Sequence, residues 1–327
     1  MAAGEMTNRP FRGPDDFAGM LAVRKGCLAE DRLSADSIRD PLPSADELAQ
    51  SFASTPAGSP NTRVVEHAGE MIGYAWIVWW TEDDRTTVYL HRYWLLPAWR
   101  GPGIAEALLA WAEKRCRALA QERGATKPTY ATNVCETERE KRALLCAAGY
   151  EVPRRVVEMR LSEPDTVSAI ALPDGVEIRP LAPEQYRAIY ALMTTAWAGL
   201  WGTIAESEES YQAFVSDNFA GSAFDPTLCQ IAWHGEEAVS LALCQIRNGL
   251  ANVTEIATHP AWKGQGLATS LLRRVIHTLH ERGVTNIWIG TDAENSRGAR
   301  AIYERVGFRG VVEHWLMRKA MPDTQAE

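Results

Sequence analysis

Apolar and polar positions along the second half of the chain follow two different periods. Between residues 266 and 283 the apolar side chains recur at helical spacing, and Gly283 ends the run. The apolar face consists of Leu267, Leu271, Leu272, Val275, Ile276 and Leu279. Shorter β-rich runs predict strands over 229–235, 237–249, 250–260, 285–292 and 310–320, and a second helical pattern covers 296–307. Helices alternating with hairpins predict an α/β fold with a mixed, mostly antiparallel sheet flanked by helices.

The first half of the chain repeats this pattern together with its landmarks. LPAWRGPGIAEALL begins at Leu96 and HPAWKGQGLATSLL at His259, and both contain Pro-Ala-Trp, a basic residue, Gly-x-Gly, an aliphatic residue and Ala. RPFRGPDDFAGML likewise corresponds to RPLAPEQYRAIYAL, and RALLCAAGYE to RAIYERVGFR. The order is kept while the spacing drifts, which indicates a duplicated domain. The turn-rich segment 162–176 separates the copies, so we expect tandem domains over 1–164 and 165–327.

Composition and charge narrow the classes of partner. The net charge is −8 and the chain has no run of five or more basic residues, which argues against nucleic-acid and membrane partners. No stretch has the roughly 18 apolar residues of a membrane span, and the start lacks the apolar core of a secretory signal. The scattered cysteines predict reduced thiols in a cytoplasmic protein and no metal site. These cysteines are Cys27, Cys116, Cys135, Cys146, Cys229 and Cys244.

The loop after Pro260 has the features of an anion-binding site. Lys263 and two glycines lead directly into the predicted helix. The start of a helix presents unpaired N–H groups and a positive dipole end, and glycine lets the backbone approach an anion. The pattern G-x-x-x-x-G-K-[ST] is absent, and Thr269 stands where a dinucleotide fingerprint has its third glycine. The loop therefore predicts a phosphate or pyrophosphate ligand of another class.

The order of strand, Pro, basic residue, Gly-x-Gly, helix and a downstream AIYERVGF resembles the GNAT superfamily of acyl-CoA-dependent N-acetyltransferases. The phosphate loop of that family reads Arg/Gln-x-x-Gly-x-Gly/Ala. Lys263, Gly266 and Ala268 match it with Lys in the first place, and Arg100, Gly103 and Ala105 match it fully. The resemblance covers nearly the whole chain as two tandem domains. This arrangement is similar to that of mycothiol synthase-like bacterial proteins.

The resemblance implies that acetyl-CoA is the co-substrate of the second domain. The pyrophosphate would bind the loop formed by Lys263, Gly264, Gln265, Gly266, Leu267, Ala268 and Thr269. The backbone of Ile256, Ala257 and Thr258 would contact the pantetheine and the thioester. Asn295 would contact the cofactor from the following loop, and Tyr303 would lie near the sulfur.

Amide formation from a thioester needs a neutral amine and a proton for the departing thiolate. Tyr303 is our candidate for the acid; the alternative is an amphipathic Tyr that packs beside Val306 and Phe308. Glu255 is our candidate for the base; the alternative is a solvated strand residue, because alternation decides its face and a bulge would reverse it. Substitutes for the base are Asp292, Glu294, His259 and water.

The first copy lacks these candidates. Leu145 stands where Tyr303 stands in the second copy, and Arg92 stands where Glu255 does. Pro102 also removes one N–H group from the first loop. We therefore expect a catalytically degenerate first domain. Its loop either still holds CoA or survives only as a packing turn, and we favour the packing turn.

The interpretation that combines these observations is an N-acetyltransferase that acts on the primary amine of a small molecule through a direct ternary complex. The alternatives are a mycothiol synthase-like acetylation of a thiol-sugar conjugate and a catalytically silent CoA-binding or regulatory protein. Trp197, Trp201, Glu206, Glu208 and Glu209 either line an acidic, aromatic acceptor pocket or form a solvated helix start with buried tryptophans. We expect a monomer or a homodimer.

Overall fold

The chain divides into two compact units in a computed structural model. The structure describes residues 6–34, 36–53, 55–101, 103–161, 163, 171–220, 224–247, 249–294 and 298–322. Unit 1 contains Met1–Arg155 and His314–Glu327, and unit 2 contains Val156–Glu313.

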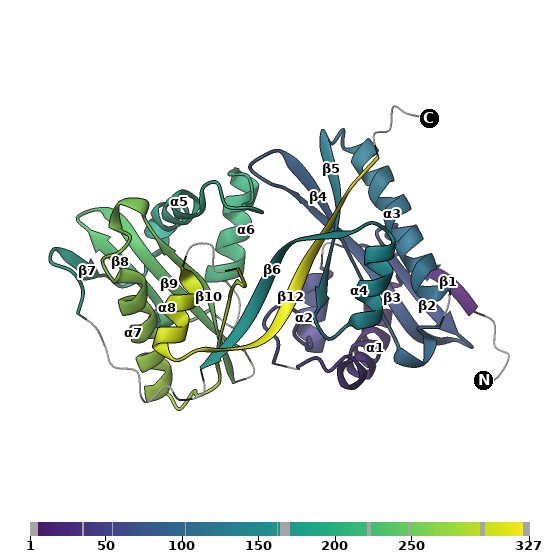
Figure 1. The fold of residues 1–327 in the computed structure, drawn as a ribbon, viewed down its shortest axis with the longest axis horizontal. Coiled ribbons are helices and arrows are strands. Elements are labelled where there is room, and N and C mark those ends of the chain that lie inside the picture. Colours follow the sequence, from purple (N-terminus) through teal and green to yellow (C-terminus); the bar gives the residue numbers. More distant parts are fainter. Residues whose placement is uncertain are drawn as a thin grey trace. The chain divides into compact units, whose positions relative to one another are not determined.

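Unit 1 is a mixed sheet with helices on both faces (Figure 1). Its strands lie in the order β1-β2-β3-β4-β5-β12, and every neighbouring pair is antiparallel except the parallel pair β4–β5. Helices α1 and α2 cover one face, and α3 and α4 cover the other. The strands are β1 (Met6–Pro10), β2 (Thr62–His67), β3 (Glu70–Thr81), β4 (Thr86–Leu95), β5 (Lys127–Cys135) and part of β12 (Arg309–Ala320). The helices are α1 (Phe17–Glu30), α2 (Ala45–Ser51), α3 (Ile104–Glu122) and α4 (Arg139–Ala147), with 3-10 turns η1 (Gly13–Asp16) and η2 (Pro97–Trp99).

Unit 2 has the same design, with strand order β6-β11-β10-β9-β8-β7 and one parallel pair, β10–β11. Helices α7 and α8 pack on one face, and α5 and α6 on the other. The strands are part of β6 (Glu151–Leu161), β7 (Val176–Ile178), β8 (Cys229–His234), β9 (Glu237–Arg247), β10 (Leu250–Thr258) and β11 (Ile287–Asp292). The helices are α5 (Tyr186–Trp197), α6 (Glu208–Phe219), α7 (Leu267–Glu281) and α8 (Ala299–Val306), with η4 (Pro183–Gln185), η5 (Pro226–Leu228) and η6 (Pro260–Trp262). The predicted mixed sheet flanked by helices is confirmed.

The compact units do not coincide with the halves predicted from the linker. Residues 156–161 of β6 come from the first half of the sequence and pair with β11 in unit 2. Residues 314–320 of β12 come from the end of the chain and pair with β5 in unit 1. The alternation within a strand shows which faces are buried but not which sheet receives the strand, so the sequence pattern does not reveal this exchange. The predicted boundary at Asp165 lies outside the described residues.

The parallel pair of each unit separates part-way along its length. In unit 2, β10 is paired with β11 only over Ala251–Val253 and Ile287–Ile289, although the strands continue to Thr258 and Asp292. A bulge between Val253 and Glu255 marks the point of separation. A bulge bends its strand and interrupts the ladder, so the bend in β10 coincides with the point at which it leaves β11.

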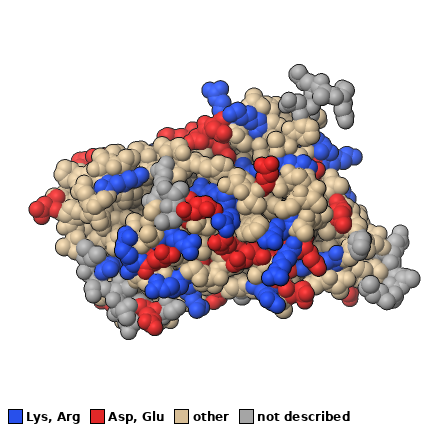
Figure 2. Space-filling model, in the orientation of Figure 1, with Lys and Arg blue, Asp and Glu red and all other residues tan. Residues whose placement is uncertain are grey.

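The surface charges and the cysteines of the described residues do not point to a further binding site. Basic and acidic side chains are interspersed on the face that Figure 2 shows. Within the described ranges, no helix is long and apolar enough to cross a membrane, and no group of His, Cys, Asp and Glu side chains is arranged to hold a metal ion. Cys146 is exposed, and the other five cysteines are buried free thiols.

Candidate active site

The loop between η6 and α7 keeps open space over its backbone. Gly264 and Gly266 have φ values of 81° and 82°, and a Cβ atom added to either glycine would meet nothing within 4 Å. Gly266 is the N-cap of α7, where its left-handed conformation is unfavourable for other residues. Lys263 is exposed and makes no ion pair with a described residue. A positive side chain and the first N–H groups of α7 are therefore available to an anion.

The two residues after this loop's glycines anchor it to the core. Leu267 is 1% exposed and packs with the buried face of α7, while Ala268 is half-buried. On the other side of the loop, the Trp262 ring lies against His234, with their ring centroids 4.9 Å apart. The loop is thus held at both ends by packing, and its middle stays exposed to solvent.

The strand before the loop offers an unpaired edge. Residues 255–258 of β10 are registered with β9, but no described residue beyond Val253 is registered with β11. Ile256 packs toward α7, and Ala257 packs on the opposite face. The Ala257 carbonyl accepts a hydrogen bond from the Ser240 hydroxyl at 2.9 Å. An extended ligand can therefore hydrogen-bond to the free edge of this segment in the manner of an added strand.

Glu255 presents a carboxyl group to the interior of unit 2. Its register partner is Leu243, which packs on the α5–α6 face, and cross-strand partners share a face. Glu255 as a whole is half-buried, but its Oε2 atom is buried and has no hydrogen-bond partner among the described residues. Burial and the nearby charge of Asp217 raise the pKa of Glu255 to about 8. The alternative of a solvated strand residue does not fit this environment.

Tyr303 lies on α8 and is 7% exposed. Its ring packs near Phe308, with centroids 6.3 Å apart, in the same cluster as Val306. Burial and the charge of Glu255 both raise the pKa of Tyr303, so the phenol is protonated at neutral pH. The side chain therefore has the packing contacts of the alternative interpretation, and it also lies close enough to Glu255 for their charges to interact.

The sequence profile of the acetyltransferase (GNAT) family matches residues 29–134 and 186–308, which together exceed half of the chain. The chain belongs to the GNAT family. Each matched region carries one copy of the Pro-Ala-Trp loop, so the family assignment covers both halves.

Curated GNAT relatives match parts of the chain. It is 33% identical over 75 residues to a [ribosomal protein bS18]-alanine N-acetyltransferase of Haemophilus influenzae, a match that spans 23% of this chain and 50% of that enzyme. It is 26% identical over 215 residues to a mycothiol acetyltransferase of Kineococcus radiotolerans, which spans 65% of this chain and 66% of the relative.

Solved structures show the same fold over nearly the whole chain. A GCN5-related N-acetyltransferase from Sphaerobacter thermophilus is 22% identical, with a TM-score of 0.74 over 96% of this chain and 95% of that chain. A tandem GNAT protein from the clavulanic acid biosynthesis pathway is 17% identical, with a TM-score of 0.69 over 98% and 100% of the two chains. These similarities confirm the predicted tandem GNAT fold.

The other candidates for the base have different environments in this GNAT chain. His259 caps η6 by accepting the Ala261 N–H group at 3.3 Å, and its Nε2 lies 3.9 Å from a carboxylate oxygen of Glu237. Asp292 accepts the Glu294 N–H group at 3.2 Å in the turn after β11. These contacts fit turn residues. Asn295, the predicted contact from the following loop, lies outside the described residues.

A polar cluster beside Glu255 was not found from the sequence. The Gln245 side-chain amide donates to the Asp217 carbonyl at 2.6 Å, and the Thr254 hydroxyl lies 3.4 Å from Asn218 Oδ1. Asn252 Oδ1 is buried without a partner among the described residues. The cluster joins the end of α6 to β9 and β10, so only the register of these strands brings its members together.

The predicted acceptor residues lie mainly on the outside of unit 2. Glu208 and Glu209 are exposed in the first turn of α6, and Glu208 pairs with Arg187 at 2.6 Å. Trp197 packs against the core, whereas Trp201 is 39% exposed. Glu206 is also exposed. This arrangement corresponds to the solvated helix start rather than to an acidic pocket.

Proposed function

We propose that unit 2 transfers an acetyl group from acetyl-CoA to a primary amine of a small molecule, by direct attack within a ternary complex. The observation that carries this proposal is the Oε2 atom of Glu255, which is buried without a hydrogen-bond partner among the described residues, on the strand that leads into the phosphate loop. A buried acceptor without a donor is costly unless a ligand supplies one. An ammonium group supplies such a donor.

The loop and the strand edge fit the two ends of acetyl-CoA. Lys263 and the N–H groups from Gly264 to Thr269 are suited to the pyrophosphate, because both glycines leave open space over the backbone. The unpaired edge of Ile256, Ala257 and Thr258 is suited to the amide groups of pantetheine. Acetyl-CoA supplies the activated acyl group as a thioester.

Glu255 and Tyr303 are suited to move the two protons of the reaction. Because its pKa is raised to about 8, Glu255 is a stronger base than an ordinary carboxylate, and its ionised form is suited to accept a proton from the amine. Tyr303 keeps its proton because its pKa is raised, and it is suited to donate that proton to the departing thiolate. The base and the acid are thus assigned to Glu255 and Tyr303 because the surroundings of both residues raise their pKa.

The test is a screen of amines with acetyl-CoA that measures the release of free CoA. We expect turnover with a subset of small primary amines, and loss of that turnover in Gly266→Glu, whose side chain adds bulk and negative charge at the phosphate site. CoA binding without turnover on any amine would favour the silent, regulatory alternative.

Similarity to the Kineococcus radiotolerans mycothiol acetyltransferase supports one narrower candidate. The acceptor would then be the amine of a thiol-sugar conjugate, and the screen should include such a compound. A kcat/KM for it well above that of simple amines is the result expected for this alternative.

A further inference from the structure

Unit 1 contains a second opening between its parallel strands, and side chains of unit 1 bridge that opening. We call this opening the first cofactor cleft. Strand β4 pairs with β5 only over Thr86–Leu90 and Lys127–Ala131, and the strands continue to Leu95 and Cys135. By position before the Pro-Ala-Trp loop, Tyr93 corresponds to Ile256. The separated part of β4 is therefore the counterpart of the pantetheine edge of β10.

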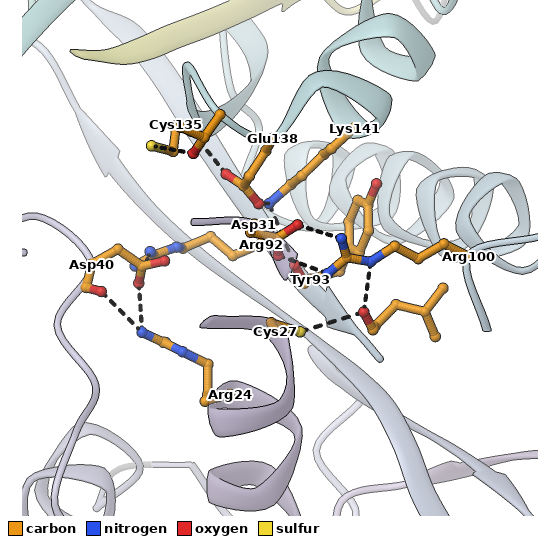
Figure 3. A network of polar contacts seen from close by, with 12 residues as sticks. Arg24, Cys27, Asp31, Asp40, Arg92, Tyr93, Arg100, Cys135, Glu138 and Lys141 are labelled. Atoms are coloured by element: carbon orange, nitrogen blue, oxygen red, sulfur yellow. Dashed lines mark hydrogen bonds and ion pairs between the residues drawn. The ribbon is translucent and has the colours of Figure 1, made fainter. Parts of the chain in front are cut away.

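An ion pair bridges the two separated strands. The Lys141 ammonium donates to the Tyr93 carbonyl on β4 at 3.4 Å and to Glu138 at 3.1 Å. The other oxygen of Glu138 accepts the Cys135 N–H group on β5 at 2.8 Å. Both charged side chains are 13% exposed, and Figure 3 shows Glu138 next to Lys141 and Cys135. In the second copy, the residue eight positions before the helix-ending glycine is Ala299 instead of Lys141.

The basic residue of the first loop is also engaged. Arg100 donates through both terminal guanidinium nitrogens, Nη1 and Nη2, to the carboxylate of Asp31, with the Nη2 contact at 2.7 Å. Its Nε donates to the Leu95 carbonyl at 2.9 Å (Figure 3). Asp31 is 5% exposed. A bidentate pair with a buried carboxylate neutralises the cation and fixes its orientation. Its counterpart in the second loop is the exposed Lys263.

A carboxylate takes the anion position at the start of the following helix. Glu106 Oε2 accepts the Gly103 N–H group at 2.9 Å at the N-terminus of α3. A carboxylate at this position satisfies one of the N–H groups, and complements the dipole, that would otherwise hold a phosphate. The corresponding residue of the second copy is Thr269, which carries no charge.

We propose that the first cofactor cleft is closed by these internal substitutes, so that unit 1 takes no acyl-CoA and the chain binds one molecule. The carboxylates of Asp31 and Glu106 stand in for the phosphates, and the Lys141–Glu138 pair stands in for the pantetheine amides. The inference rests on the proposed function for the identity of the ligand. The closure itself is carried by contacts within unit 1.

Calorimetric titration of the full chain with coenzyme A tests the stoichiometry. We expect one site in the parent and none in Gly266→Glu. Two sites in the parent, of which one remains in Gly266→Glu, would overturn the closure of unit 1. One site in both proteins would instead contradict the assignment of the phosphate to the Gly266 loop. No binding in the parent would instead overturn the proposed function of unit 2.

A gain-of-binding variant tests the closure independently of unit 2. The variant combines Asp31→Asn, Glu106→Thr and Lys141→Ala with Gly266→Glu. The first three changes remove the internal substitutes from unit 1, and Gly266→Glu keeps coenzyme A from binding to unit 2. We expect one new, weak site for coenzyme A. A folded triple variant, judged by circular dichroism, that binds no coenzyme A would show that these side chains are not what closes the cleft.

The matched control is Glu122→Gln in the same background. This change breaks the Arg115–Glu122 pair, at 2.8 Å, on the same helix as Glu106 but at its far end. It should produce no site. If the triple variant does not fold, the stoichiometry of the parent and of Gly266→Glu still decides between one cleft and two.

Discussion

At the scale of single residues, the environment of Glu255 determines what it can do. A carboxyl group with a buried oxygen and a neighbouring negative charge is protonated at neutral pH until a cation approaches. The approach of a substrate ammonium reverses both effects, because it supplies a hydrogen bond and a positive charge. Binding of the amine and proton transfer to Glu255 are therefore linked.

Glu255→Gln should lower turnover by roughly 10²–10⁴-fold, the range for loss of a general base. In the parent, kcat/KM should rise with pH through about 8, because only the ionised carboxylate accepts a proton. The variant should lack that rise, and the pH profile of kcat/KM is the measurement. An unchanged profile would assign the base to another group.

Glu255 should make the protein less stable as pH rises, although the same rise in pH increases kcat/KM. Its folded-state pKa of about 8 exceeds its ordinary value of 4.5, so the folded state holds the proton more tightly. The free energy of unfolding should therefore decrease as pH rises through this interval. Thermal unfolding of Glu255→Gln should show a smaller decrease than that of the parent.

Asp217→Asn should shift the apparent pKa of the kcat/KM profile downward, because it removes a negative charge that raises the pKa of Glu255. The substitution keeps the backbone carbonyl that accepts from Gln245. Glu209→Gln on the same helix is the control and should leave the profile in place, since Glu209 is exposed in the first turn. Equal shifts in both variants would indicate a general effect of net charge.

Tyr303→Phe keeps the ring and removes the proton. Turnover should fall toward the smaller end of roughly 10²–10⁴-fold, since a thiolate leaves fairly well unprotonated, while the Kd for acetyl-CoA changes little. Leu145→Ala at the matching position of unit 1 should cost about 2–5 kcal/mol of stability, because the side chain is fully buried, without changing turnover per folded molecule. Parent-like turnover in Tyr303→Phe would leave Tyr303 with packing alone.

The sequence predicted these site residues unevenly. Lys263 and Gly266 follow from a local motif, because a loop that begins a helix exposes its N–H groups wherever it occurs. The face of Glu255 depends on a bulge, which no alternation pattern shows in advance. Asp217 reaches Glu255 from a helix distant in sequence, so its effect could be seen only in three dimensions.

At the scale of elements, α7 begins at Leu267, within one residue of the predicted start at Gly266, since Gly266 and the apolar face of the helix are both local signals. The separation of β10 from β11 was not predicted from periodicity, because it is a property of two strands together. In unit 1 the same separation holds side chains of α4 and of the turn before it, Lys141 and Glu138.

His91 on β4 should make unit 1 sensitive to mild acid. Its Nε2 lies 2.8 Å from the Tyr150 hydroxyl, and burial lowers its pKa from 6.5 to about 3. The unfolded chain takes up the proton first, so the free energy of unfolding should fall as pH drops below about 6.5. His91→Gln, which cannot be protonated there, should flatten the thermal unfolding profile between about pH 5 and 6.5, above the usual carboxylate range. An equal slope in both proteins would assign the sensitivity elsewhere.

At the scale of the whole molecule, the exchanged strands tie each unit to both halves of the sequence. Met317 on β12 is fully buried in the core of unit 1, although it lies far from the rest of that unit in sequence. The tandem duplication could be predicted from repeated motifs. The exchange could not, since each strand has the same alternation whichever sheet it joins.

Met317→Ala should therefore destabilise unit 1 by about 2–5 kcal/mol, the cost of a cavity in a core. Coenzyme A should protect unit 2 alone, so with saturating ligand the variant should show an early unfolding transition that the ligand does not move. Thermal unfolding with and without coenzyme A is the measurement. A ligand shift equal for every transition would mean that the units unfold together.

The exchange also fixes an order of events during synthesis. Residues 1–155 leave the ribosome first, but the sheet they form lacks a strand until residues 314–320 have been made. Unit 2 can form its whole sheet before unit 1 does, because residues 156–313 contain all of its strands and are translated before residues 314–320. Since translation proceeds at about 5–20 residues per second, the first unit waits roughly 10–30 seconds with β5 uncovered. The unit translated first is thus the last to finish, and a chaperone that covers an open sheet edge would find its substrate there.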